Sequence, residues 1–265
     1  MKRQALEEVV NRYIEQIEKH SDRVPGNFDQ SAIHDLRVGY KKIRAFLRLL
    51  QLEPDAGDLQ MPLKLKAVYQ SSGKVRDLQL FLEQIGNAAD AALLPAYCKC
   101  CNQQLFACKE QAVKSIEDIQ FKKVIHSIKK ELPGHLQPDI LRKFMQQKIA
   151  AIHILLLVVN DDKDLHTIRK HLKDIIYVIR IYEHDFEMPF PIQDYASEKQ
   201  LSDMASRLGD FNDCCIAVSL LQTLCVNESS MINEKLLLQK LQQNWVHQKE
   251  EQKKKLLQEV QVLAL

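Results

Sequence analysis

Basic side chains recur at helical spacing in two segments of the chain, HDLRVGYKKIRAFLR at residues 34–48 and HTIRKHLKDIIYVIR at residues 166–180. Steps of three and four residues gather side chains on one face of an α-helix. The members of these two basic stripes are His34, Arg37, Lys41, Arg44 and Arg48 in the first and His166, Arg169, Lys173 and Arg180 in the second. Guanidinium groups match phosphate oxygens as planar forks, and lysine ammonium groups act as compact point charges. Rows of both groups predict a site for an extended, regularly charged polyanion.

The histidines that open the stripes have two candidate roles. His34 and His166 could donate to a phosphate group and would gain positive charge beside it. Either ring could instead cap a helix or form an interhelical hydrogen bond. The sequence leaves both roles open.

Each stripe shares its helix with an apolar face. At about 100° per residue, the basic members of the first stripe lie within about 80° of His34, and the apolar residues gather on a separate face. In the second copy, Ile176 stands where the first has Arg44, and Asp174 stands where the first has Lys42. The second stripe is therefore expected to be the weaker cationic surface.

The stripes belong to a longer internal repeat. The segment RLGDFNDCCIAV at residues 207–218 answers SSGKVRDLQLFL at residues 71–82, which pairs Gly73 with Gly209 and Asp77 with Asp213. Glycine is costly inside a helix, so both glycines predict close helix–helix approach. We expect each aspartate to have a structural role, reaching a neighbouring helix and orienting a stripe arginine or histidine.

Helix signals cover nearly the whole chain. Of 265 residues, 46% are apolar and only seven are glycine, and no stretch shows the period-two alternation of a strand. Helices are expected near residues 4–20, 31–51, 61–85, 88–111, 114–131, 138–158, 163–186, 195–225 and 230–263. The predicted fold class is all-α, with two antiparallel four-helix bundles related by a pseudo-twofold axis. Residues 1–135 would form the first bundle and 136–265 the second, within one domain and with a hinge near residues 132–138.

Charge and hydropathy limit the classes of protein to which this chain can belong. The net charge is only +2, so a cationic site must come from segregation of charge rather than from excess. The longest apolar run, residues 149–159, is too short to span a bilayer. The first helix is amphipathic rather than a signal peptide. We therefore expect a cytoplasmic protein with no membrane partner.

Seven cysteines in a chain of this size favour reduced thiols in the cytosol. Cys98, Cys100, Cys101 and Cys108 lack paired C-x-x-C spacing, and neighbouring residues on a helix point about 100° apart. These four, with Cys214 and Cys215, are interpreted as small core residues, and no metal site is expected.

The four repeated segments resemble the pattern of the CHAD domain, the conserved histidine α-helical domain. That pattern runs H-x-x-R-h-x-x-[KR]-[KR]-x-R and then L-G-x-h-R-D-h in the first half or L-G-x-h-N-D-h in the second. The resemblance spans nearly the whole chain, and it implies two helical bundles, a basic groove between them, binding of inorganic polyphosphate and association with polyphosphate granules. It assigns all nine stripe residues to polyphosphate, with Lys42, Lys74 and Arg76 as further candidates.

Some positions depart from that pattern. Lys41 and Lys42 stand where arginine is frequent in the family, Gly39 interrupts the helix, and the second stripe lacks two basic positions. These changes bear on affinity rather than on fold. Many relatives carry a fused CYTH domain with the signature E-x-E-x-K, which is absent here. We therefore expect no hydrolysis by this chain alone, no catalytic residue and no cofactor.

Other functions would use the same residues. The main alternative is a protein that binds the nucleic-acid backbone, but Tyr40 and Phe46 lie off the basic face and leave no row of aromatic rings to stack on bases. An enzyme acting on phosphoanhydrides would need metal-binding carboxylates, for which Asp77 and Asp213 are the candidates. In a structural scaffold, the stripes would be internal salt-bridge ladders. The preferred partner is inorganic polyphosphate rather than nucleic acid.

Overall fold

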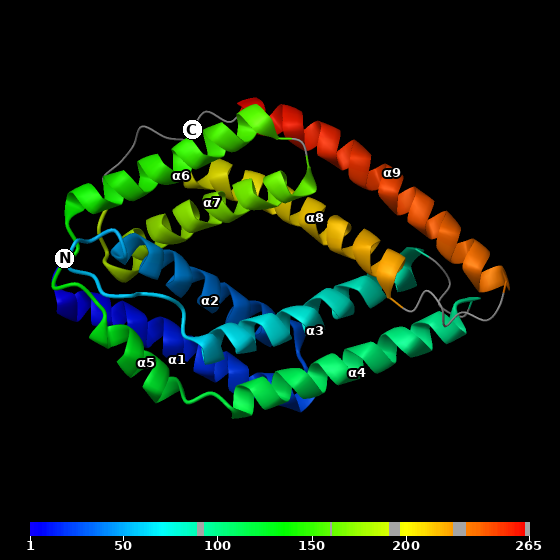
Figure 1. The fold of residues 1–265 in the computed structure, drawn as a ribbon, viewed down its shortest axis with the longest axis horizontal. Helices are drawn as coiled ribbons and strands as arrows, with labels where there is room; N and C mark the ends of the chain where they lie inside the picture. The colour runs from blue at the N-terminus through cyan, green and yellow to red at the C-terminus, as the bar shows by residue number, and fades with distance from the viewer. Residues whose placement is uncertain (89–92, 160, 191–196, 225–231, 263–265) are drawn as a thin grey trace.

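The computed structural model describes residues 1–88, 93–159, 161–190, 197–224 and 232–262, and these form an all-α fold (Figure 1). The α-helices are α1 (Arg3–Asn27), α2 (Gln30–Leu50), α3 (Leu63–Ala88), α4 (Pro95–Glu117), α5 (Phe121–Lys130), α6 (Pro138–Val158), α7 (Asp162–Arg180), α8 (Glu198–Thr223) and α9 (Ile232–Val262). Within those ranges, extended pairing is limited to one isolated β-bridge between Lys2 and His135. The predicted all-α class is therefore confirmed.

Two helices differ from the boundaries that the sequence predicted. The helix expected near 88–111 begins at Pro95, which suits the first turn because no N–H is needed there. The next helix, expected near 114–131, is α5, which has only 10 residues. At the end of α7 the chain continues as one π-helical turn, Ile181–Asp185.

Local caps fix where the two stripe helices begin. The Asp29 side chain accepts hydrogen bonds from the backbone N–H groups of Ser31 and Ala32 at the start of α2. At the start of α7, Asp161 and Asp164 form a reciprocal capping box. Each such cap stabilises a helix by about 1 kcal/mol. The residues that begin the stripes, His34 and His166, therefore stand at defined positions within the first two turns.

The stripe helices lie at the centre of the molecule. α2 packs against α7, and α3 approaches α8, while α1 and α6 cover the outer sides of the central pair (Figure 1). The larger buried cluster contains apolar residues of both halves. A smaller cluster joins α3 and α4 to α8 and α9 through Phe81, Tyr97, Val218 and Trp245. Both cores thus cross the predicted boundary near residue 135, and the division into two repeated bundles stays a prediction.

Two further properties of the described chain concern membrane-spanning helices and the state of the cysteines. None of its helices is both long and apolar enough to cross a membrane. Cys98, Cys101, Cys108, Cys214 and Cys215 are free thiols. Cys100 is disulfide-bonded, contrary to the expectation of reduced thiols throughout, and Cys225 lies outside the described residues.

Candidate functional site

A cavity of about 550 Å³ lies between α2 and α3 of the first half and α7 and α8 of the second. The charged and titratable side chains that line it are Arg37, Lys41, Arg44, Arg76, Arg169, Lys170 and Lys173, with His34 and His166, and Asp77 and Asp213. Seven Lys and Arg side chains thus face two carboxylates in a chain whose net charge is only +2. Cationic side chains are therefore concentrated on the lining of this cavity.

Seven of the nine predicted stripe residues line this cavity, and two do not. Arg48 Nη1 lies 2.7 Å from Oδ2 of Asp174, a nearly buried carboxylate that Lys148 also contacts at 2.7 Å. Arg180 donates through Nε and Nη2 to Glu198 Oε1, at 2.9 and 2.6 Å. The last arginine of each stripe therefore forms an internal ion pair, as the scaffold hypothesis expected for the stripes as a whole.

The two repeated glycines make room for stripe arginines. A Cβ added at Gly73 would lie 2.2 Å from Nη1 of Arg37, and one added at Gly209 would lie 3.2 Å from Nη2 of Arg169. We predicted close approach of two helices at these glycines. Instead, a guanidinium group approaches the helix backbone in each half, so Arg37 lies over α3 and Arg169 over α8 at equivalent places.

Arg37 is fixed by further contacts within the first half. Its Nη1 donates to the carbonyl oxygen of Tyr69 at 2.8 Å, and its guanidinium lies 4.5 Å from the Tyr69 ring centroid. The Tyr69 ring in turn stacks on Tyr40, with centroids 4.1 Å apart. The repeat places Ala205 at the position of Tyr69, so Arg169 has no equivalent aromatic partner.

Several buried nitrogen atoms in the cavity have no hydrogen-bond partner within the described chain. They are Nε of Arg44 and Nε of Arg169, which are both donors, and Nδ1 of His166, which donates when it carries a proton. A buried polar group without a partner costs about 1–3 kcal/mol, and more when it is charged. Acceptor oxygens of a bound anion could satisfy these groups.

Lys41 lies where the two stripes meet. Burial lowers its pKa, and the neighbouring cations Arg37, Arg169, Arg44 and Lys173 lower it further, to about 7. Burial also lowers the pKa of Lys173 and those of His34 and His166. Without an anion the cavity disfavours its own charges, and a bound anion would restore them.

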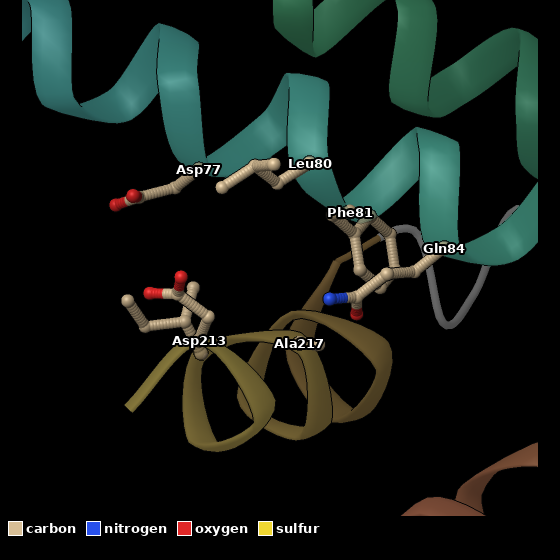
Figure 2. A pocket seen from close by; sticks show the side chains of 7 residues that line it. Asp77, Leu80, Phe81, Gln84, Asp213 and Ala217 are labelled. Atoms are coloured by element: carbon tan, nitrogen blue, oxygen red, sulfur yellow. The ribbon is translucent and has the colours of Figure 1, made fainter. Parts of the chain in front are cut away.

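The two repeated aspartates face one another. Asp77 on α3 and Asp213 on α8 point toward each other beside a small pocket that Leu80, Phe81 and Ala217 also line (Figure 2). Burial raises the pKa of Asp77, and the nearby Arg37 counteracts this. Among the residues with described positions, neither carboxylate forms an ion pair within 4.0 Å with a stripe cation. If the two aspartates orient stripe residues, as predicted, they must do so over distances longer than 4.0 Å.

Some residues that line the cavity are not among the predicted members of the two stripes. Tyr177 lies four residues after Lys173 and three before Arg180, so it shares the spacing of the second stripe, and Lys170 likewise lies four residues after His166. Tyr69 carries no such signal because it comes from α3 and its place in the repeat is not aromatic. Among the further candidates, Arg76 lines the cavity, whereas the Lys42 ammonium lies 5.5 Å from the Tyr13 ring centroid.

Comparison with known proteins places the chain in a family. Residues 8–222 match the family model of the CHAD domain. The crystal structure of the CHAD domain from the plant Ricinus communis has a TM-score of 0.75 at 18% identity, covering 99% of this chain and 92% of that chain. PptA from Streptomyces chartreusis has a TM-score of 0.70 at 14% identity, covering 98% of this chain and 99% of that chain. No curated protein matches the sequence. Since the family model covers most of its length, the chain belongs to the CHAD domain family.

Proposed function

We propose that this protein binds inorganic polyphosphate in the cavity between its two halves, without hydrolysing it. One observation carries the proposal: cationic side chains of both stripes converge on one cavity while only two carboxylates line it. Charge-assisted contacts between guanidinium groups and phosphate oxygens are among the stronger hydrogen bonds in proteins. The family resemblance stated from the sequence implies the same ligand.

A polymer suits this cavity better than a single small anion. Cations line it from three helices, α2, α3 and α7, and arginine Nε groups without a partner come from both halves, at Arg44 and Arg169. Successive phosphates of one chain could engage these groups together, and each bound phosphate would hold its neighbours at high effective concentration. Affinity should therefore rise with chain length.

Nucleic acid fits the cavity less well. Binding of single strands commonly uses exposed aromatic faces on which bases stack. The Tyr40 and Tyr69 rings stack on each other, and Arg37 covers Tyr69. Tyr177 is 5% exposed and lies beneath the Lys173 ammonium. The cavity thus supplies charge for a phosphate backbone but few free rings for bases.

In the cell, we propose that polyphosphate binding directs the protein to polyphosphate granules. Binding without hydrolysis is part of the same proposal. Phosphate release that requires a divalent cation would contradict it and would direct attention to Asp77 and Asp213.

Titration calorimetry of the full chain with long-chain polyphosphate tests the proposal, with duplex DNA at matched phosphate concentration as comparator. Release of condensed counterions should make binding salt-dependent, so five phosphate contacts would lower affinity roughly 100-fold between about 50 and 200 mM salt. DNA should bind much more weakly. Equal binding of both polymers would favour nucleic-acid binding, and no binding to either would leave the stripes as structural features.

A further inference from the structure

A second cavity adjoins the central one on the side of the first half. It has a volume of about 460 Å³ and lies against α3 and α4, with Lys74, Gln70, Gln111 and Ser115 among its lining residues. The two cavities share Arg37, Tyr69 and Asp77 as lining residues. The second cavity therefore lies next to the central one, with these shared side chains between the two.

Arg37 stands at the junction of the two cavities. Its guanidinium occupies the space that a Cβ at Gly73 would fill, and its Nη1 donates to Tyr69 O. A guanidinium carries N–H donors along more than one edge, so a single arginine can contact anions on two sides. The shared Asp77 is the unfavourable group at this junction, but it lies close to Arg37, Lys41 and Arg76, whose charges together exceed its own.

The equivalent surface of the second half is more acidic, although the repeat places Arg207, which pairs with Glu259, at the position of Ser71. Lys74 directly follows Gly73, whereas Asp210 directly follows Gly209, and both side chains are exposed. The repeat likewise pairs Ala67, a lining residue of the second cavity, with the exposed Asp203. A polyanion leaving the central cavity would therefore meet a lysine beside α3 but, on α8, two carboxylates and an arginine that already pairs with a carboxylate.

We propose that a polyphosphate chain too long for the central cavity leaves it on one side only, past Arg37 into the α3/α4 cavity and along Lys74. This inference rests on the proposed function and adds a direction to it. Surface charges of one sign attract a polyanion and those of the other sign repel it, so the two exits are not equivalent. Short polyphosphate would occupy the central cavity alone.

The test compares tripolyphosphate with long-chain polyphosphate on Lys74→Gln. Loss of one phosphate contact should lower long-chain affinity about three- to tenfold and leave tripolyphosphate affinity within about twofold. Lys235→Gln is the matched control, because Lys235 is an exposed lysine on α9. It makes the same change in net charge and should alter neither affinity beyond about twofold.

Asp210→Asn tests the opposite exit. It should not increase long-chain affinity selectively over tripolyphosphate affinity. A selective increase would overturn the proposal, as would a Lys74→Gln variant that affects both ligands equally or neither. Failure of the underlying function looks different: wild-type protein would bind no polyphosphate, or Lys41→Gln would bind it as tightly as wild type.

Discussion

Arg37 on α2 and Arg169 on α7 occupy equivalent places over Gly73 and Gly209, yet their surroundings differ. Arg37 donates to Tyr69 O and lies over the Tyr69 ring. Arg169 Nε is buried without a hydrogen-bond partner in the described part of the protein. The first half thus presents an arginine that the protein already holds, and the second presents one with a donor left for a ligand. The internal repeat therefore keeps the position of the arginine but not its hydrogen bonds.

A second contrast runs along each stripe. The members nearer the helix N-terminus face the cavity, whereas the last arginine of each stripe pairs with a carboxylate of the protein. Arg48 bridges to Asp174 on α7 of the other half, and Arg180 bridges to Glu198 on α8. The same residue type therefore supplies free charge at one end of the stripe and joins helices at the other.

Charge reversal at the meeting point of the halves should have the largest effect. Lys41 faces cations of both stripes, whereas Lys173 faces Arg169 and Arg180 and is partly offset by Glu198. Because charge-assisted hydrogen bonds contribute about 1.5–3 kcal/mol each, Lys41→Glu should lower polyphosphate affinity at least about 100-fold and Lys173→Glu about tenfold. Calorimetry measures both, with circular dichroism to check folding. Equal losses would show that the halves contribute alike.

The pH dependence of binding should also depend on Lys41. Its pKa is about 7 in the free protein, and a bound polyanion would raise it, so binding takes up a proton above pH 7. Affinity should then fall as pH rises, by roughly fivefold between pH 7 and pH 8. Burial also lowers the pKa values of His34 and His166 in the free protein, and a bound polyanion would raise them in turn.

Calorimetry in buffers of different ionisation enthalpy measures this proton uptake directly. Lys41→Arg is the matched variant, because arginine stays charged throughout the range. It should bind polyphosphate with little pH dependence. A Lys41→Arg variant that retained the wild-type pH dependence would assign the proton to another group.

Substitution of the two glycines should have a smaller effect on polyphosphate affinity and compares the two stripe arginines directly. Alanine is favoured over glycine in helices by about 1 kcal/mol, so Gly73→Ala and Gly209→Ala should both fold. The added methyl group at residue 73 must displace the Arg37 guanidinium, whereas at residue 209 a shift of a few tenths of an ångström suffices. We expect Gly73→Ala to lower affinity about threefold and Gly209→Ala less than twofold, in line with loss of a single hydrogen bond of about 1 kcal/mol. A larger effect of Gly209→Ala would reverse the assignment of the fixed and the free arginine.

The sequence predicted much of this fold because its signals are local. Helical periodicity lies within single segments, and caps such as Asp29 involve residues two or three positions apart. The stripes located the cavity for the same reason, since one face of one helix carries each of them. Tyr177 lies at the same spacing within the second stripe, between Lys173 and Arg180.

The residues that the stripe arginines contact could not be predicted in the same way. The ion pairs of Arg48 and Arg180 depend on carboxylates of other helices, and periodicity within a stripe does not identify them. The stack of Arg37 on Tyr69 depends on a residue of α3 that the repeat does not preserve. The packing of the Arg37 guanidinium against Gly73 likewise depends on which side chain of a neighbouring helix reaches this glycine. Only the three-dimensional arrangement shows this.

Two double variants of equal charge test the central claim most directly: Arg37→Gln with Arg169→Gln, and Arg48→Gln with Arg180→Gln. Each removes one arginine from each stripe, but only the first pair lines the cavity. Titration with long-chain polyphosphate should show about a 100-fold loss for the first pair and less than about a threefold loss for the second, since charge-assisted contacts are lost only in the first. Equal losses in both variants would mean that general positive charge, and not this cavity, binds the polymer.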